Sequence, residues 1–439
     1  MWQLRATRAG HRAGAIDSTT VEEAVRHPVW MLVLAIGCGA ASLAHADDAP
    51  PVDEVVARAR QRAPALLALH ARAAAAQEEV GAAGVLPDPM LEFVYQDVNF
   101  PSYTVGEEEM SMIGVELRQT LPFFGKRGAR RAAAQAQAIL RTSESAEMER
   151  LIVLEVRRLY AQLYAVDRAT ESLDAAAELL AMLEASVTAR YGTGQAELVD
   201  ALKTQLARSR LRERRDDLGA SRAALAAALN RYLDERSPIG RVASLPEPEP
   251  LRAGWDTLAL RTAPRVLARA AAVTAAAERA QAARKERPPD LYVGAGYSYR
   301  GDFDHLATFR LGMDLPFWRG RRTKPLVRAA EHELEMARSE QGDAEAMTHA
   351  VVTRLAAAWS RSQAQLDLYR EAIVPQSGMV LDAARNSYLA GRGDFPAVIE
   401  GFEVWLESRL QLANREAERF TTWAEIDALL TPSHTEGQQ

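Results

Sequence analysis

The sequence predicts an α+β membrane protein made of two tandem structural repeats, in which long helices are joined to short β-hairpins. The first observation is a strand-to-helix corner, read LPFFGKR at Leu121–Arg127, which recurs as LPFWRGRR at Leu315–Arg322. In both copies a Pro closes an alternating segment, and Gly with basic residues opens a helical one. The second observation is the period-two pattern before each corner, and the third is the very long helical pattern after it.

Composition and charge argue against two kinds of site. The chain has 439 residues and a formal net charge of −6, and its basic residues alternate with acidic ones along the predicted helices. Nucleic-acid binding uses a concentrated basic surface, so we expect no nucleic-acid partner. With a single cysteine, Cys38, the chain can form neither a disulfide framework nor a cysteine-based metal site.

The N-terminal segment has the pattern of a secretory signal. An apolar run covers Val29–Ala44 and is followed by Ala-His-Ala, so residues 1–46 are predicted to be a signal peptide cleaved after Ala46. Lipidation at Cys38 is the alternative, because the residues before it loosely resemble a lipoprotein cleavage site.

The remaining chain divides into two repeats. The first is predicted over residues 47–250 and the second over 251–432, followed by a disordered tail at 433–439. Each repeat opens with a helical segment, and a Pro- and acid-rich linker at 237–250 lies along the outside between them. The matching positions are 194 to 200 residues apart, namely Pro64 and Pro264, Pro122 and Pro316, and Tyr191 and Tyr388.

Each repeat also contains one β-hairpin. The predicted strands are Met90–Val98, Met110–Gln119, Leu291–Tyr299 and 308–314. One face of these strands is apolar, with residues such as Val293 and Leu311, and the other is small or polar, with residues such as Ser298 and Gly312. Such a pattern suits lipid on one side and water on the other, and a half-buried hairpin in a soluble domain is the alternative.

The strand count predicts an oligomer if these strands cross a membrane. A strand of about 9 to 11 residues can cross a bilayer, but an open sheet edge would leave unpaired backbone groups in lipid. Known membrane barrels need at least about eight strands, whereas one chain supplies four. Several chains must then share one barrel.

Long coiled-coil helices follow the corners. Arg127–Arg190 is a helical pattern of about 95 Å, with apolar residues at seven-residue spacing from Ile152 to Val187. The second copy repeats the spacing from Val352 to Val380, with a bend expected at Pro375. Gly-containing turns then lead into return helices, of which the second is predicted over Pro396–Leu430.

This order of elements resembles the outer-membrane efflux channels of the TolC family over nearly all of the mature chain. The most specific marks are the two corners and the two tips, Tyr191–Gly194 and Tyr388–Gly391. The resemblance implies a homotrimer with a shared transmembrane β-barrel and a hollow coiled-coil α-barrel in the periplasm. It also implies three partners: outer-membrane lipid, a periplasmic adaptor and an inner-membrane efflux pump.

Within the family, the first corner and the Leu86–Pro89 entry to the first strand look most like the branch that serves heavy-metal exporters. The resemblance therefore implies passive exit of heavy-metal cations. Efflux of drugs or other organic solutes, or type I secretion, remains the alternative, because no His or Cys cluster has metal-ligand spacing.

The resemblance also assigns roles to individual residues. Adaptor docking is expected at Tyr191, Gly194, Tyr388 and Gly391. Acidic residues past the second tip ring the pore constriction in the family, and Glu400 matches one of them. The other family acid falls on Ala397, while the nearby Asp394 is a local departure that can add to the same ring.

Two other classes of protein are weighed against the channel. A periplasmic coiled-coil adaptor or scaffold would contain the helices without a pore. An enzyme is disfavoured, because the sequence contains no catalytic triad pattern, phosphate-binding loop or HExxH-like metal motif. We expect neither catalytic residues nor a cofactor.

Overall fold

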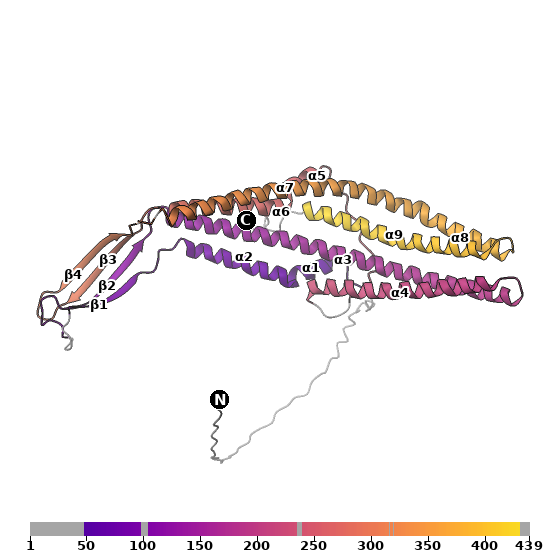
Figure 1. Cartoon of the computed structure of the whole chain (residues 1–439), viewed down its shortest axis with the longest axis horizontal. Helices are drawn as coiled ribbons and strands as arrows, with labels where there is room; N and C mark the ends of the chain where they lie inside the picture. The colour runs from indigo at the N-terminus through magenta and orange to yellow at the C-terminus, as the bar shows by residue number, and fades with distance from the viewer. Residues whose placement is uncertain (1–47, 98–103, 235–238, 316, 319, 431–439) are drawn as a thin grey trace, which may run out of the picture. The chain divides into compact units, whose positions relative to one another are not determined.

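The computed structural model describes residues 48–97, 104–234, 239–315, 317–318 and 320–430 (Figure 1). The predicted signal peptide with Cys38, Pro316 of the second corner and the predicted tail at 433–439 lie outside the described residues.

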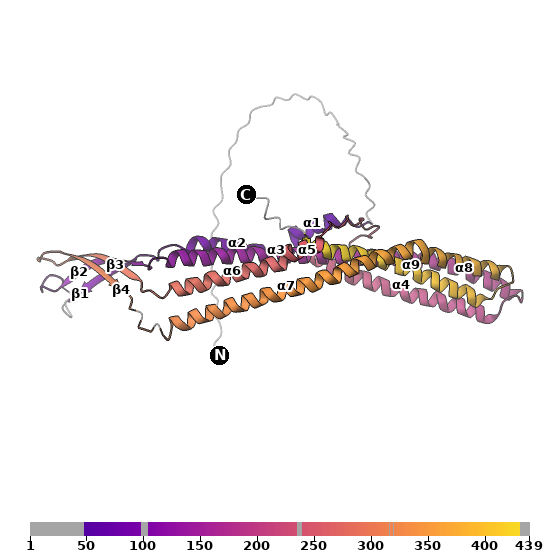
Figure 2. The same ribbon diagram turned by 90° about the horizontal axis from the view of Figure 1, so that it is seen from above.

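The two repeats contain corresponding elements in the same order, except that a π-helix divides the long helix of the second repeat. The first contains α1 (Val52–Arg62), α2 (Pro64–Ala83), β1 (Met90–Gln96), β2 (Met112–Leu121), α3 (Lys126–Gly192) and α4 (Leu198–Leu233). The second contains α5 (Trp255–Thr262), α6 (Pro264–Lys285), β3 (Leu291–Tyr299), β4 (Leu306–Met313), α7 (Thr323–Leu368), the π-helix η1 (Tyr369–Ile373), α8 (Val374–Leu389) and α9 (Phe395–Leu430). The helices run side by side, with the strands beyond one end and the tips at the other (Figures 1 and 2).

The opening segment of each repeat is two helices, whereas the sequence pattern suggested one. The breaks fall at Ala63 and Ala263, whose ψ angles are 114° and 126°. Each precedes a proline, and the proline ring disfavours helical geometry in the residue before it. Pro64 and Pro264 then occupy the first position of the next helix, where their missing N–H costs nothing.

The four strands form one antiparallel sheet in the order β1-β2-β3-β4. The two hairpins meet at the β2–β3 pair, where Val115 lies opposite Tyr297. One face consists of large apolar side chains that nothing covers in the described chain: Phe93, Phe309 and Leu311 are 78%, 83% and 78% exposed. The predicted division into an apolar and a polar face is therefore present in the structure.

The polar face is more tightly packed than the sequence suggests. Glu116 is buried there, with its carboxylate 3.1 Å from the guanidinium of Arg310. A Cβ added at Gly294 would lie 3.1 Å from a carboxylate oxygen of Glu116, and one at Gly312 would lie 2.1 Å from the ring of Tyr292. These two glycines make room for larger side chains that lie across the sheet.

Helix α3 is the central element of the helical part, and it packs against α2, α4, α6 and α9. Its predicted seven-residue seam is largely buried, since Ile152, Leu159, Leu173, Leu180 and Val187 are all at most 4% exposed. None of the helices in the described ranges combines the length and the apolar character that a bilayer crossing requires.

The second seam departs from the prediction at the π-helix. Val380 is 56% exposed, and the buried position has moved to Leu381. The cause is η1, which ends two residues before Pro375 and adds a residue to one turn. Since Pro375 has no N–H to donate into the previous turn, the helix widens there and the buried face shifts by one residue.

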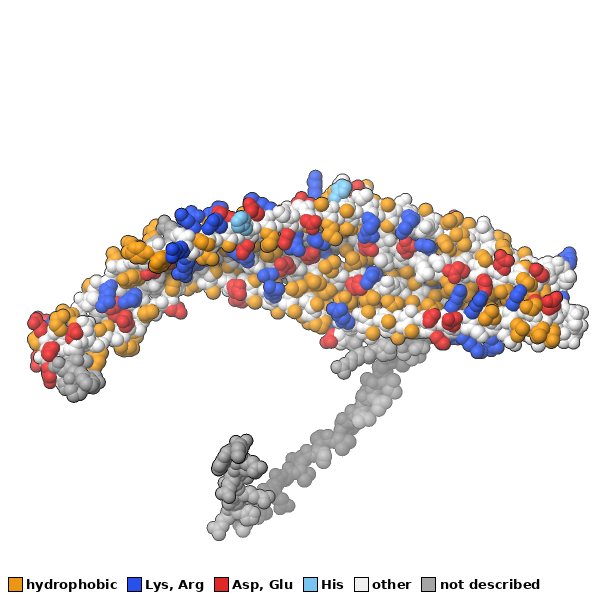
Figure 3. Space-filling model, in the orientation of Figure 1, with side chains coloured by type: hydrophobic (Ala, Val, Ile, Leu, Met, Phe, Trp, Pro, Cys, Tyr) orange, Lys and Arg blue, Asp and Glu red, His pale blue; other side chains and the backbone are white. Residues whose placement is uncertain are grey.

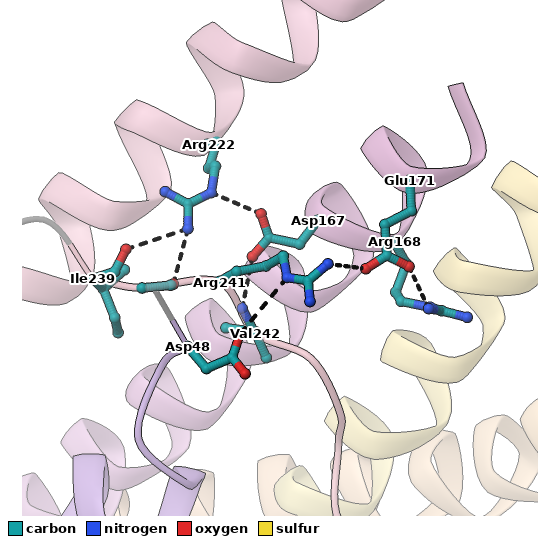
Figure 4. A network of polar contacts seen from close by, with 9 residues as sticks. Asp48, Asp167, Arg168, Glu171, Arg222, Ile239, Arg241 and Val242 are labelled. Carbon is teal, nitrogen blue, oxygen red and sulfur yellow. Dashed lines mark hydrogen bonds and ion pairs between the residues drawn. The ribbon is translucent and has the colours of Figure 1, made fainter. Parts of the chain in front are cut away.

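The linker between the repeats is anchored to α3 rather than lying wholly outside. Ile239 and Val242 are buried in the core beside α3 and α4. Asp167 of α3 accepts hydrogen bonds from Arg222 Nε at 2.7 Å and from the Val242 N–H at 2.9 Å (Figure 4). The side chain of Arg222 also donates to the carbonyl of Gly240 at 2.8 Å, so one buried ion pair holds the linker to two helices.

Candidate functional site at the helical tips

The first tip is a tight turn between α3 and α4. The N–H of Gln195 donates to the carbonyl of Arg190 at 2.8 Å, and Gly194 has a φ of +74°. Glycine adopts this left-handed geometry without the strain that most side chains cause, which explains Gly194. Glu197 and Asp200 then form a capping box that opens α4.

The second tip has the same design with one further constraint. Gly391 has a φ of +71°, and the N–H groups of Arg392 and Gly393 both donate to the carbonyl of Ser387. A Cβ at Gly393 would lie 2.9 Å from the Ser387 hydroxyl, so this position also requires glycine. The sequence pattern predicts a turn over both glycines and a docking role for Gly391, but it does not reveal the close packing at Gly393.

The two tips contact each other through Arg190. Its Nη1 donates to the carbonyl of Tyr388 at 3.0 Å, and its guanidinium lies 4.7 Å from the centre of the Tyr388 ring. Tyr388 is buried, 5.4 Å from the ring of Phe395, whereas Tyr191 is 48% exposed. The two matched tyrosines therefore differ: Tyr388 holds the tips together and Tyr191 is available to a partner.

An apolar stripe on α4 adjoins the first tip. Leu198, Leu202 and Leu206 are 55%, 54% and 53% exposed in the single chain. Their spacing of four residues places them on one helix face. Contiguous exposed apolar surface of this kind is typical of a contact with another protein surface.

The predicted acidic residues both lie at this end of the molecule. Asp394 is exposed and immediately precedes α9, and Glu400 is exposed one and a half turns into it. Within the described residues neither has an ion pair, whereas Glu403 pairs with Arg210 at 3.3 Å. Next to Glu400, Gly401 brings α9 close to α8, because a Cβ there would lie 3.2 Å from the Leu381 Cα.

The described ranges were also predicted to lack a cluster of His and Cys metal ligands. No group of three or more His, Cys, Asp or Glu side chains in them is arranged to hold a metal ion.

Comparison with known proteins finds a family match over the second repeat. Residues 256–431 match the family model described as outer membrane efflux protein, so the second repeat has the sequence pattern of that family. Comparison with the curated proteins finds no match by sequence.

Solved structures extend the likeness to both repeats. The outer membrane protein VceC of Vibrio cholerae is 20% identical, with a TM-score of 0.72 over 87% of this chain and 97% of that one. CusC, studied for its folding and transmembrane channel formation, is 15% identical, with a TM-score of 0.73 over 87% and 92%. The CmeC outer membrane channel of Campylobacter jejuni is 13% identical, with a TM-score of 0.70 over 86% and 85%.

The predicted fold class is thereby confirmed. Long helices and short strands, arranged as two tandem repeats, are shared with these outer-membrane channels over most of the chain. At these identities the likeness concerns the fold, and the roles of individual residues at the tips stay predictions.

Proposed function

We propose that this chain is the outer-membrane exit channel of a tripartite efflux pump. The observation that supports it most is the sheet, in which one face of large apolar side chains is exposed and the other face is polar. Phe93, Phe309 and Leu311 are suited to lipid, and Glu116 and Arg310 are suited to a water-filled lumen. The family match of the second repeat supports the same function.

The functional unit in this proposal is a homotrimer. The sheet has two free edges, at β1 and β4, and free edges are not tolerated in lipid. Three sheets joined edge to edge give a closed barrel, and the helices of three chains enclose a periplasmic α-barrel. The exposed stripe of Leu198, Leu202 and Leu206 is suited to the contact between neighbouring chains.

The tips are the proposed docking surface for a periplasmic adaptor, which in turn connects to an inner-membrane pump. They lie at the end opposite the sheet (Figure 1). Gly194 and Gly391 have open space around them, with no atom within 4 Å of an added Cβ. A partner backbone can therefore approach both turns closely.

Bulky substitutions test this docking surface. Both Gly194 and Gly391 have positive φ angles, so Gly194→Trp combines bulk with backbone strain. Gly192→Trp adds the same bulk at the first tip without the backbone strain, because Gly192 is helical and its surroundings are equally open. Loss of adaptor cross-linking in both tryptophan variants, with normal membrane insertion, is the expected result. Cross-linking at the wild-type level in both would place docking elsewhere.

Heavy-metal cations are the proposed cargo. This finer assignment is supported by the likeness of the first corner to the heavy-metal branch, and organic solutes are the alternative. A strain lacking the chain should become sensitive to divalent transition-metal salts and keep its resistance to apolar organic toxicants. Sensitivity to organic toxicants with retained resistance to metal salts would indicate that the channel exports organic solutes.

Membrane fractionation tests the proposal as a whole. We expect the full chain in the outer-membrane fraction, soluble only in detergent and migrating on gels as a heat-dissociable trimer. A soluble coiled-coil adaptor or scaffold would instead be extracted without detergent, and that result would overturn the channel proposal.

A further inference from the structure

Cationic residues at the start of α3 divide into two pairs with different surroundings. Lys126 and Arg130 lie on one face, and Arg127 and Arg131 lie on another, because residues four apart share a helix face. The first pair is neutralised. Lys126 is buried and its Nζ lies 2.7 Å from Asp290, while Arg130 Nε lies 2.6 Å from Glu286.

The second pair has no such partner. Arg127 and Arg131 are exposed, and no acidic side chain in the described part of the chain lies within ion-pair distance of either. Arg127 Nε donates to the carbonyl of Gly84 at 2.8 Å, and the stem of Arg131 packs close to Gly84, so both are held at the end of α2. Their remaining guanidinium N–H groups are available to an external anion.

These two arginines line a pocket whose other walls are mostly apolar. The pocket has a volume of about 580 Å³. Its apolar lining comes from the connection between α2 and β1, from the end of β2 with the corner that follows it, and from the start of β3: Leu86, Leu121, Pro122, Phe123, Phe124 and Leu291. Phe124 is 88% exposed, which is unusual for a Phe facing water.

The pocket lies where the strands meet the helices. Hydrophobic side chains gather over this junction beside Lys and Arg side chains (Figure 3). If the strands cross the outer membrane, the junction is at the level of the lipid head groups of its periplasmic leaflet. Aromatic and basic residues are the ones enriched at that level.

We propose that this corner pocket binds one anionic phospholipid of the periplasmic leaflet. The phosphate would be held by Arg127 and Arg131, and an acyl chain would lie against Phe124 and Leu121. Charge complementarity identifies this occupant. Two guanidinium groups without an ion pair line a pocket whose other walls are mostly apolar, and a ligand that is anionic at one end and apolar at the other matches both. The inference rests on the outer-membrane location proposed above.

Lipid binding by the purified full-length protein tests the inference. Native mass spectrometry with phosphatidylglycerol as the probe should show a bound lipid on the wild type. The variant Arg127→Gln/Arg131→Gln should bind it at least about tenfold more weakly, because charge-assisted hydrogen bonds are lost. The matched control is Arg212→Gln/Arg338→Gln, two exposed arginines far from the corner in sequence, and it should bind like the wild type.

Two further arms identify the ligand. Glycerol 1-phosphate, which has the head group without acyl chains, should fail to displace phosphatidylglycerol at equal concentration. Phe124→Ser should weaken phosphatidylglycerol binding without disturbing the fold, because the Phe124 side chain is exposed and contributes little to the core. Displacement by the head group alone, or unchanged binding by the double glutamine variant, would overturn the inference.

The same preparations separate this inference from the proposed function. If the wild type is absent from the outer-membrane fraction, the proposed function fails. If it is present and the arginine variant binds phosphatidylglycerol as the wild type does, only the lipid site fails.

Discussion

At the scale of single residues, the buried carboxylate of Asp167 is expected to contribute strongly to the free energy of unfolding. Its carboxylate is satisfied by Arg222 and by the Val242 N–H, and its side chain is 5% exposed. Removing one partner of a buried ion pair leaves the other charge uncompensated. Asp167→Ala should therefore lower the free energy of unfolding by about 3 kcal/mol, measured by thermal or denaturant unfolding in detergent.

Glu171 on the same helix supplies the control for Asp167. It accepts a hydrogen bond from Arg241 at 2.7 Å, but both side chains are partly exposed. Exposed ion pairs contribute less than about 1 kcal/mol, so Glu171→Gln should be nearly neutral. Equal losses in the two variants would mean that burial does not decide the effect.

Asp290 at the first corner predicts a pH dependence. Burial works to raise the pKa of its carboxyl, but the ion pair with Lys126 and the hydrogen bond from the Phe123 N–H outweigh burial and hold the pKa below 3.8. A lowered folded-state pKa gives stability that is present above pH 3.8 and lost as the pH falls through the folded pKa. The melting temperature of Asp290→Asn should therefore lie below that of the wild type at neutral pH.

The pH series provides the internal check for Asp290. The gap in melting temperature between wild type and Asp290→Asn should narrow as the pH falls below 3.8. A gap that stays constant down to acid pH would show that the asparagine acts through packing and not through charge.

At the scale of elements, the two faces of the sheet predict opposite responses to charge. Leu311→Arg puts a cation on the apolar face and should destabilise the trimer by about 2 to 4 kcal/mol if it lies near the bilayer midplane. Thr308→Asp puts a charge on the polar face of the same strand and should be tolerated. Trimer stability on heated gels measures both, and a similar loss in both variants would contradict the face assignment.

The choice of Thr308 follows from the structure. Gly312 and Ser298 are equally polar-face positions by alternation, but Gly312 lies beneath the Tyr292 ring and Ser298 is buried. An aspartate at Gly312 would clash with the Tyr292 ring, and one at Ser298 would be desolvated. Neither substitution could therefore distinguish a lumen-facing from a lipid-facing position. Alternation alone identifies the face and says nothing of how closely it is packed.

Most of the element order could be predicted because it depends on local patterns. Apolar periodicity and the positions of Pro and Gly predict three of these elements: the corner at Leu121–Arg127, the strand at Leu291–Tyr299 and the return helix ending at Leu430. The exposed side chains of Phe309 and Leu311 also follow from alternation.

Features that depend on contacts between distant residues could not be predicted. Arg190 and Tyr388 are 198 residues apart, and no local pattern pairs them. The shift from Val380 to Leu381 requires knowing that the turn before Pro375 becomes a π-helix. The different surroundings of Arg127 and Lys126 likewise depend on Asp290, which is far away in the sequence.

At the scale of the whole molecule, both tips of one chain lie at the same end, which is the periplasmic end of the proposed channel. Arg190 joins them by a hydrogen bond to the Tyr388 carbonyl, so movement of one helical pair would be transmitted to the other. In a trimer, three such linked pairs would surround the central axis. We therefore expect the linked tips of each chain to move together when the constriction proposed at this end opens.

The last prediction concerns the proposed constriction at Glu400. Its carboxylate is exposed, and within the described residues it has no ion pair that would neutralise it. Three such carboxylates around a narrow pore would focus negative potential, favour cations and bind multivalent blockers. Glu400→Gln should weaken cation selectivity and block by multivalent cations in planar-bilayer recordings, with an unchanged yield of trimer.

Two variants sharpen the test of Glu400. Glu403→Gln changes an acid one turn away that is already paired with Arg210, and it should leave selectivity and block unchanged. Asp394→Asn, at the start of α9, should add to the effect of Glu400→Gln if both acids face the pore. The difference in block between the wild type and Glu400→Gln should be largest at low salt, because salt screens the charge of the carboxylates least there. A Glu400→Gln channel that conducts and is blocked like the wild type would place the constriction elsewhere.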